Sequence, residues 1–388
     1  MPSPDCPSRC RTDEWWIVLA LATAPAVALG FGRFAYALLL PAMQAEFGLD
    51  YTGAGLLATA NAFGHLAGAV ACSRYAHRIS PAALFAGSMA ACALGLLATG
   101  AVSGFAPILL LRFLVGLGGG VAFIAGAVLA GRLGTTPTAI YFCGAGAGIA
   151  LSGSILPLLL ERLGNAAWGI AWAGMGVVAL AATYWAARAA DCIDGAASAA
   201  PPPQGGWRAR HLLPTLAAYF LFGVGYIVYM TFVVAWMREQ AASAGQVALV
   251  WSAIGLASVV APWLWRRTLH VGRQGRPLAA ACLLLAAGTA LPLASKGFAM
   301  MLVSALVFGS ALFVVPTGIT ETVRRCLPPA KWPAALAGLT VVFGIGQLIG
   351  PTAAGLLGDI FGSLQQPLIA GAVSLLAAAS LSLLQEDR

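Results

Sequence analysis

Long apolar blocks divide the chain, and they limit its possible folds more than any other feature. A helix needs about 20 successive apolar residues to cross a bilayer, and twelve such blocks lie between charged or Gly/Pro-rich breaks. The residues are 60% hydrophobic and 9% charged, whereas soluble domains are about 25% charged. We therefore predict an all-α membrane protein. A β-barrel is disfavoured, because its strands would be about 10 residues long with alternating polarity.

The predicted spans form two bundles of six helices. The first bundle, residues 15–190, has spans at 15–42, 52–73, 81–102, 106–131, 137–160 and 168–190. The second bundle, residues 212–384, has spans at 212–237, 246–265, 277–295, 298–323, 333–358 and 364–384. A polar, proline-containing linker is predicted at 191–211, with tails at 1–14 and 385–388.

The basic residues predict the orientation in the membrane. With both termini cytoplasmic, sixteen Lys and Arg residues fall on the cytoplasmic side and three on the other, as the positive-inside rule requires. The net charge of +8 is scattered over short loops, so we do not expect a nucleic-acid partner. We expect a multi-pass protein of the cell membrane, the bacterial inner membrane in particular, that functions as a monomer in the lipid bilayer.

The two bundles are related by an internal repeat. Residues 30–36 align with residues 223–229, and both glycines and the final tyrosine are kept. Weaker matches follow in the same order: residues 61–64 with 252–255, Gly119 and Phe123 with Gly309 and Phe313, and residues 161–164 with 359–362. Such duplication predicts two pseudo-symmetric halves that move about a central site, as in many secondary transporters.

Several motifs carry a family resemblance. They are Gly32-Arg33-Phe34-Ala35-Tyr36 with Leu39-Leu40-Pro41, the small-residue-rich segment 56–68, the run 112–120 (RFLVGLGGG), and Phe343-Gly344-Ile345-Gly346-Gln347 with Gly350-Pro351. With twelve spans and duplicated halves, the chain resembles the major facilitator superfamily, and in particular its YbfB/YjiJ-type branch. The resemblance implies that spans one, four, seven and ten line a cavity and that alternating access carries a solute across. One departure is the missing acidic residue in the loop 72–78 and in its equivalent, 266–276.

Two arginines lie inside apolar spans. A charge there is costly unless it faces a bundle interior or a wet cavity, so Arg33 is a candidate for substrate or gate contact. The alternative is that Arg33 bonds carbonyls freed near Gly30 and Gly32. Arg112 is a second candidate, with helix positioning as its alternative. Two such cations repel each other unless an anion lies between them, and guanidinium groups bind carboxylate or phosphate well.

Four uncharged polar residues complete the predicted substrate site. Tyr36, Tyr226 and Tyr229 lie in the two repeated stretches and could bound an amphipathic substrate, although aromatic packing explains them equally well. Asn61 lines the path or hydrogen-bonds another helix, and the second role is the commoner one.

Two titratable residues are candidates for proton coupling. Glu321 is the acid nearest to the membrane interior in the second half, but Arg324 and Arg325 follow it at ion-pair spacing. His65 lies in the second span, where a histidine can titrate near neutral pH. The alternative for His65 is a hydrogen-bonded interior histidine.

These features predict a secondary active transporter of a small organic solute. An anionic substrate is favoured, because neither arginine has an obvious buried acid partner, and proton coupling is left open. The alternative is broad-specificity efflux of amphipathic or aromatic compounds. We do not expect an enzyme, since the sequence has no His-Glu-x-x-His motif, intramembrane aspartate pair or Ser/His pairing. No catalytic residue, metal site or other cofactor is predicted.

Overall fold

The protein is helical throughout the residues that the structure describes. The computed structural model describes residues 14–75, 78–194, 212–271 and 275–386, and these contain no strand. The first half comprises α1 Glu14–Pro25, η1 Ala26–Phe34, α2 Ala35–Phe47, α3 Tyr51–Tyr75, α4 Pro81–Ala101, α5 Phe105–Leu133, α6 Thr135–Leu163, η3 Asn165–Ala167 and α7 Trp168–Asp194. The second comprises α8 Leu213–Glu239, α9 Ala244–Val271, α10 Arg276–Ala294, α11 Phe298–Leu312, α12 Val314–Cys326, η5 Pro329–Lys331, α13 Trp332–Phe361 and α14 Gln365–Ser382.

The first predicted span is longer than expected. The elements α1, η1 and α2 form one 33-residue helix, Trp15–Phe47, and η1 is a π-helix. The predicted end at residue 42 is too early, because Pro41 lies inside α2 and the helix closes at Gly48 with φ 60°. Membrane helices tolerate an internal proline because neighbouring groups satisfy the freed backbone. Arg33 therefore lies near the middle of this long helix.

Eleven of the described helices are long and apolar enough to cross a membrane. Each of the first eleven predicted spans corresponds to one such helix, and the tenth of them, Phe298–Cys326, is interrupted within its length. There α11 ends at Leu312, because Pro316 of α12 cannot bond the carbonyl four residues before it. The predicted twelfth span corresponds to α14, an 18-residue helix that starts at Gln365 and packs against α8 and α10.

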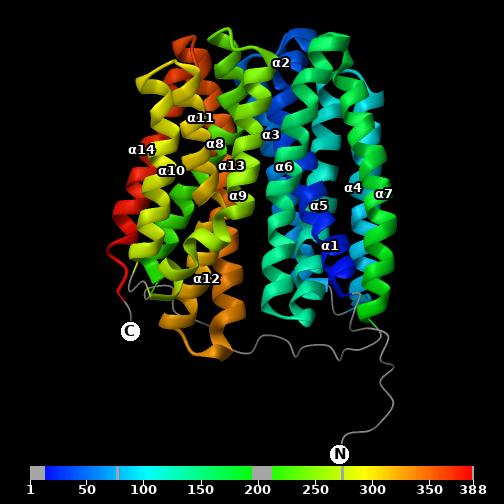
Figure 1. Ribbon diagram of the computed structural model, residues 1–388, viewed down its shortest axis with the longest axis vertical. Coiled ribbons are helices and arrows are strands. Elements are labelled where there is room, and N and C mark those ends of the chain that lie inside the picture. Colours follow the sequence, from blue (N-terminus) through cyan, green and yellow to red (C-terminus); the bar gives the residue numbers. More distant parts are fainter. Residues whose placement is uncertain (1–13, 76–77, 195–211, 272–274, 387–388) are drawn as a thin grey trace, which may run out of the picture.

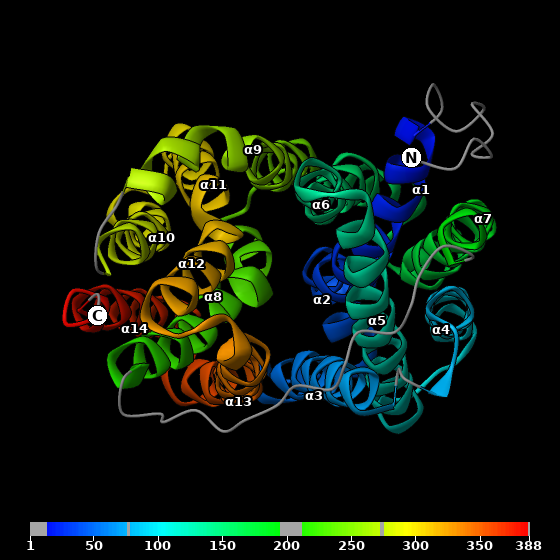
Figure 2. The ribbon, with the colours of Figure 1, turned by 90° about the horizontal axis from the view of Figure 1, so that it is seen from below.

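The helices form two bundles that meet along a few helix pairs. The most extensive contacts between the halves are α6 with α9 and α3 with α13, followed by α2 with α8. Figure 2 shows the first two pairs side by side across the molecule. Glycines permit these approaches, because a Cβ on Gly146 of α6 would lie 2.7 Å from the Gly255 carbonyl oxygen of α9. Small residues at such crossings are typical of helix packing in membranes.

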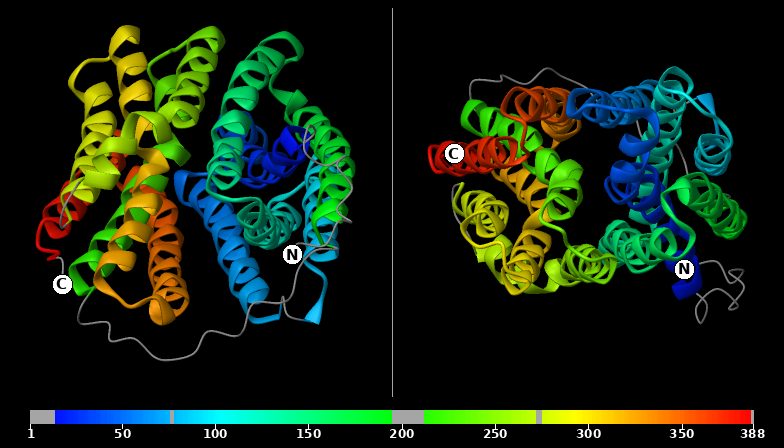
Figure 3. Two further views of the ribbon diagram at one scale, coloured as in Figure 1. Left: turned by 60° about the horizontal axis from the view of Figure 1, so that its bottom comes forward. Right: turned by 90° about the horizontal axis from the view of Figure 1, so that it is seen from above.

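The two ends of the molecule can be distinguished by the chain path. The end of α7 and the start of α8 lie at the bottom of Figure 1, together with the start of α1 and the end of α14; we call this the linker end. The opposite end, where α2 leads into α3, is the far end. Of the predicted linker, residues 191–194 belong to α7 and residues 195–211 lie outside the described residues. Of the predicted tails, residues 1–13 and 387–388 also lie outside the described residues. Figure 3 shows the same two bundles from two further directions.

Candidate functional site

Arg33 lies in the π-helix η1, near the middle of the long helix Trp15–Phe47. Arg33 is only 7% exposed, and among the described residues its buried Nη2 atom has no hydrogen-bond partner. The guanidinium carbon is 5.8 Å from the centre of the Phe34 ring. Arg33 is also close enough to Tyr226 and His65 to interact with them electrostatically. A buried donor on a charged group that lacks a partner costs free energy, which makes this atom available to an acceptor from outside the protein.

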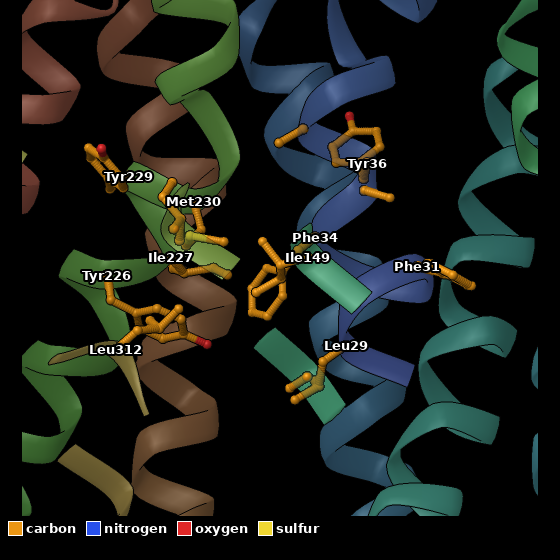
Figure 4. Close-up of a cluster of buried hydrophobic side chains, with 14 of the residues drawn as sticks. Leu29, Phe31, Phe34, Tyr36, Ile149, Tyr226, Ile227, Tyr229, Met230 and Leu312 are labelled. Carbon is orange, nitrogen blue, oxygen red and sulfur yellow. The ribbon is translucent and has the colours of Figure 1, made fainter. Parts of the chain in front are cut away.

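A small cavity between the two halves adjoins Arg33. Its volume is about 10 Å³, roughly the space that one water molecule needs. The first half contributes Arg33, Phe34, Tyr36, Ala37, Ala58 and Arg112, and α8 contributes Ile227, Met230 and Thr231. In Figure 4, Phe34 and Ile149 of the first half face Ile227 and Met230 of α8. None of the lining residues is acidic, so the lining offers no counter-charge for Arg33.

Arg112 is held within the first half. It is 1% exposed, and its Nη1 atom donates a hydrogen bond of 2.6 Å to the Gly32 carbonyl oxygen of η1. Its guanidinium carbon lies 4.7 Å from the centre of the Tyr36 ring and 5.4 Å from that of Trp172, which are cation–π distances. This geometry matches the helix-positioning alternative, although Arg112 also borders the cavity and its Nε atom has no partner.

Asn61 of α3 joins three helices at the same place. Its Nδ2 group donates to the Gly32 carbonyl oxygen at 3.2 Å and to the Arg112 carbonyl oxygen at 3.1 Å. It therefore fixes η1 against α3 and α5. The alternative role proposed for Arg33, bonding a carbonyl near Gly30 and Gly32, is thus filled at Gly32 by Arg112 and Asn61.

The tyrosines divide into different environments. The Tyr36 hydroxyl donates to the Ala54 carbonyl oxygen at 2.9 Å, and Tyr36 borders the cavity. The Tyr226 hydroxyl accepts a hydrogen bond from Nε2 of Gln347. The Tyr229 hydroxyl is 2.8 Å from the Ser304 hydroxyl. Figure 4 shows Tyr226 pointing toward the first half and Tyr229 pointing away from it.

Tyr226 belongs to an aromatic stack in the second half. Tyr219, Phe222 and Tyr226 follow one another along α8, and Phe343 of α13 packs against all three. The rings of Tyr219 and Phe343 are 4.5 Å apart and 8° from parallel. This aromatic stack forms an apolar face of α8 next to Gln347.

The two proton-coupling candidates lie outside the cavity lining. Glu321 of α12 forms an ion pair of 3.2 Å with Arg324, as its spacing predicts. His65 of α3 is partly buried, and its ring centre lies 5.8 Å from that of Phe123. Among the described residues, no group of three or more His, Cys, Asp or Glu side chains could hold a metal ion.

Sequence reasoning assigned no site role to several residues around the cavity. Gln347 bonds Tyr226, Trp172 covers Arg112, and Thr231 borders the cavity. The signal for Gln347 was available, because a polar residue inside an apolar span is a candidate for function. Thr231 and Trp172 carry no such signal, since threonine and tryptophan are common in membrane helices.

Comparison with known protein families places the chain. The family model described as "Uncharacterised MFS-type transporter YbfB" matches residues 25–383. The chain belongs to this YbfB-like family of the major facilitator superfamily. It is therefore a multi-pass membrane protein of a transporter family. No curated protein sequence matches it.

Solved structures confirm the fold of this YbfB-like chain. A bacterial homologue of the human lysosomal transporter Spinster, in an inward-facing and occupied conformation, has a TM-score of 0.69 at 15% identity, covering 96% of both chains. The human organic anion transporter MFSD10 (TETRAN) has a TM-score of 0.64 at 15% identity, covering 95% of this chain and 99% of its own. A D-xylose-proton symporter has a TM-score of 0.72 at 13% identity, covering 95% and 97%. At these identities the similarity establishes the major facilitator fold and no substrate.

Proposed function

We propose that this protein is a secondary active transporter of a small organic anion that works by alternating access. Arg33 is the group that binds the anion. The observation that carries the proposal is the buried Nη2 atom of Arg33, which lies beside a cavity shared by both halves and finds no hydrogen-bond partner in the part of the chain that the structure describes. A carboxylate or phosphate oxygen would supply the missing acceptor, and a charge-assisted hydrogen bond is stronger than a neutral one.

The other predicted site residues have supporting roles in this proposal. Arg112 and Asn61 fix the Gly32 carbonyl oxygen and so hold η1 in position, while Tyr36 and Tyr226 bound the site. Tyr229 is assigned to the packing of the second half, because its hydroxyl pairs with Ser304. The apolar lining from Ile227 and Met230 suits a substrate with a small apolar body.

Orientation and assembly form part of the same proposal. The excess of basic residues places the linker end and both termini in the cytoplasm, so the far end faces the outside. The membrane is the bacterial inner membrane, and the monomer is the working unit. Among the fold neighbours, one is an organic anion transporter and another a sugar–proton symporter by their printed names, which leaves the choice to the site itself.

Thermal unfolding of the purified protein with candidate ligands tests this function. A bound ligand at about 100 times its Kd stabilises the folded state by roughly 2.7 kcal/mol. We expect organic acids, and not neutral sugars or amines, to raise the Tm of the parent protein. Arg33→Gln should abolish that rise, whereas Lys296→Gln, which removes an exposed cation between α10 and α11, should keep it. An equal rise in Arg33→Gln would contradict the anion site.

The aromatic stack favours a second function, efflux of amphipathic or aromatic compounds. Tyr219, Phe222, Tyr226 and Phe343 present nearly parallel rings, and flat apolar molecules pack well on such surfaces. Competition separates the two functions. Aromatic cations and neutral amphiphiles that compete as strongly as organic acids would favour the second one.

Proton coupling is tested at Glu321 and His65. Transport driven by an imposed pH gradient should be compared in the parent, Glu321→Gln and His65→Gln. Loss of gradient-driven transport, with substrate exchange retained, would assign coupling to the substituted residue. Because Glu321 already pairs with Arg324 at the linker end, we expect its substitution to leave the gradient dependence unchanged.

A further inference from the structure

A carboxylate from the second half caps a helix of the first half at the far end. Asp359 lies near the end of α13, and its Oδ1 atom accepts a hydrogen bond of 2.8 Å from the Tyr51 backbone N–H. Its Oδ2 atom accepts from the Thr52 backbone N–H at 2.9 Å and from the Thr52 hydroxyl at 2.5 Å. Tyr51 and Thr52 are the first two residues of α3. We call these three bonds the cross-half cap.

The cap satisfies backbone groups that α3 cannot satisfy alone. The first N–H groups of a helix have no partner within it and carry partial positive charge. Asp50, the residue before α3, accepts from the Gly53 backbone N–H at 2.7 Å, which leaves the N–H groups of Tyr51 and Thr52 to Asp359. The start of α3 is thus held by one carboxylate from its own half and one from the other.

A second bond between the halves lies beside the cap. The Tyr51 hydroxyl donates to Oε1 of Glu239 at 2.5 Å, and Glu239 is the last residue of α8. Gly355 and Gly358 of α13 allow Tyr51 to lie close, since a Cβ on Gly358 would be 3.0 Å from its ring. The start of α3 is therefore bonded to two helices of the second half.

The α6–α9 pair, which is equivalent to α13–α3 in the repeat, is capped differently at the far end. Residues 161–164 at the end of α6 correspond to residues 359–362 in the repeat, so Glu161 holds the place of Asp359. However, α9 is capped within its own half. The Ser243 hydroxyl accepts from the Gln246 backbone N–H at 3.2 Å, and Oε1 of Gln246 accepts from the Ser243 N–H at 2.9 Å, which is a capping box.

We propose that Asp359 is a gate residue of the transport cycle, whose carboxylate holds the far end closed by capping α3 from the opposite half. Opening of the far end separates α13 from α3, so the cross-half cap must break and two backbone N–H groups must turn to water. The α6–α9 pair can separate without such a loss, because the cap of α9 moves with α9. The gate therefore depends on one acid and not on its repeat equivalent, and this holds for any substrate.

Thiol labelling from outside the cell tests the gate. Ala58→Cys places the reporter on the cavity lining, where a membrane-impermeant maleimide arrives from outside only when the far end opens. Lys296→Cys, exposed in the loop between α10 and α11, reports sidedness and expression. Each reporter is measured against the chain without it, which corrects for the native cysteines. If Lys296→Cys labels only in inverted vesicles, the assay is run on those, because the far end then faces the cytoplasm.

Removal of the Asp359 charge should speed labelling at Ala58→Cys. We expect Asp359→Asn to raise the rate about tenfold, which is a modest value for charge-assisted bonds at a solvent-exposed site. Asp359→Glu should return the rate toward that of the parent, and Lys296→Cys should label equally in all variants. The matched control is Glu161→Gln, which removes an exposed acid at the same end and should leave the rate unchanged.

Two results would overturn the proposal. One is a labelling rate in Asp359→Asn that equals the rate in the parent. The other is an acceleration of labelling in Glu161→Gln as large as in Asp359→Asn, which would indicate a general effect of surface charge. If Asp359→Asn does not accumulate in the membrane, Thr52→Val decides the question, because it removes the side-chain bond from α3 to Asp359. A few-fold acceleration in Thr52→Val supports the gate, and a labelling rate equal to that of the parent contradicts it. No substrate is needed, so the result is independent of the anion site.

Discussion

Residues 30–36 and residues 223–229 hold equivalent places in the two halves but have different local structures. The first stretch lies mostly in the π-helix η1, and the second lies in the regular helix α8. At the matching position, Arg33 has a buried donor without a partner, whereas the Tyr226 hydroxyl is bonded by Gln347. At this position the first half thus has a charged side chain with an unpaired donor, and the second half has a tyrosine whose hydroxyl is hydrogen-bonded.

The final tyrosines of the two stretches remain alike. Tyr36 and Tyr229 are each 1% exposed, and each hydroxyl is hydrogen-bonded. Each ring is also covered, by Arg112 at 4.7 Å and by Phe308 at 4.1 Å respectively. The packing positions of the repeat are thus alike in the two halves, whereas one interior position differs in charge and in backbone structure. A π-helical segment at that position agrees with the frequent occurrence of such segments at functional sites.

The largest expected effect separates Arg33 from Tyr226. Arg33→Gln should lower transport by about 100-fold, because a bidentate guanidinium contact with an anion is worth several kcal/mol when desolvated. Tyr226→Phe removes one neutral hydrogen bond and should cost no more than about tenfold. Initial rates of uptake or efflux in proteoliposomes give the ratio. Similar losses in both variants would break the proposed difference between the halves.

The next effect separates Arg112 from Arg33. Arg112→Met removes the bond to the Gly32 carbonyl oxygen and both cation–π contacts, so the free energy of unfolding should fall by about 3 kcal/mol. Arg33→Gln should leave stability unchanged or raise it, since it removes an unpaired buried charge. Denaturant unfolding in mixed micelles measures both variants. A greater loss of stability in Arg33→Gln than in Arg112→Met would reverse the two assignments.

A smaller effect compares the two final tyrosines. Tyr36→Phe and Tyr229→Phe each delete one buried hydroxyl contact, and each should cost about 1 kcal/mol of stability. Tyr229→Phe should leave transport at the parent rate, because Tyr229 points away from the first half and its hydroxyl pairs with the Ser304 hydroxyl. The same unfolding and transport assays apply. A transport defect in Tyr229→Phe without a stability change would return Tyr229 to the substrate site.

The smallest effect concerns Glu321. Its partner Arg324 is exposed, and exposed ion pairs contribute at most about 1 kcal/mol. Glu321→Gln should therefore change neither the unfolding midpoint nor the transport rate beyond experimental scatter. A strong transport defect would give the second half an essential charge and weaken the contrast with Arg33.

Much of the fold follows from the sequence because its signals are local. Apolar length predicts each span, and the repeat predicts two related halves without any knowledge of contacts. Local signals fail where a neighbour changes the outcome. Pro41, for example, lies inside its helix, which continues to Phe47.

The candidate site was predicted in part. The sequence identifies Arg33 and Arg112 as interior charges, because an arginine in an apolar span is conspicuous by itself. The sequence does not show which of the two arginines is hydrogen-bonded within the protein, since the partner of Arg112 is the carbonyl oxygen of Gly32, 80 positions earlier. The bonds from Asp359 to Tyr51 and Thr52 join residues more than 300 positions apart, and no local pattern marks them.

The membrane class, the duplicated halves and the interior position of Arg33 follow from the sequence alone, because hydrophobic length and charge are properties of single segments. Three features require the folded chain: the bond from Arg112 to η1, the buried donor of Arg33 that has no partner among the described residues, and the bonds to Asp359 that join the halves. Each of these depends on which helices lie side by side, and hydrogen bonds at 2.6 to 2.9 Å between distant segments exist only after the bundles have packed.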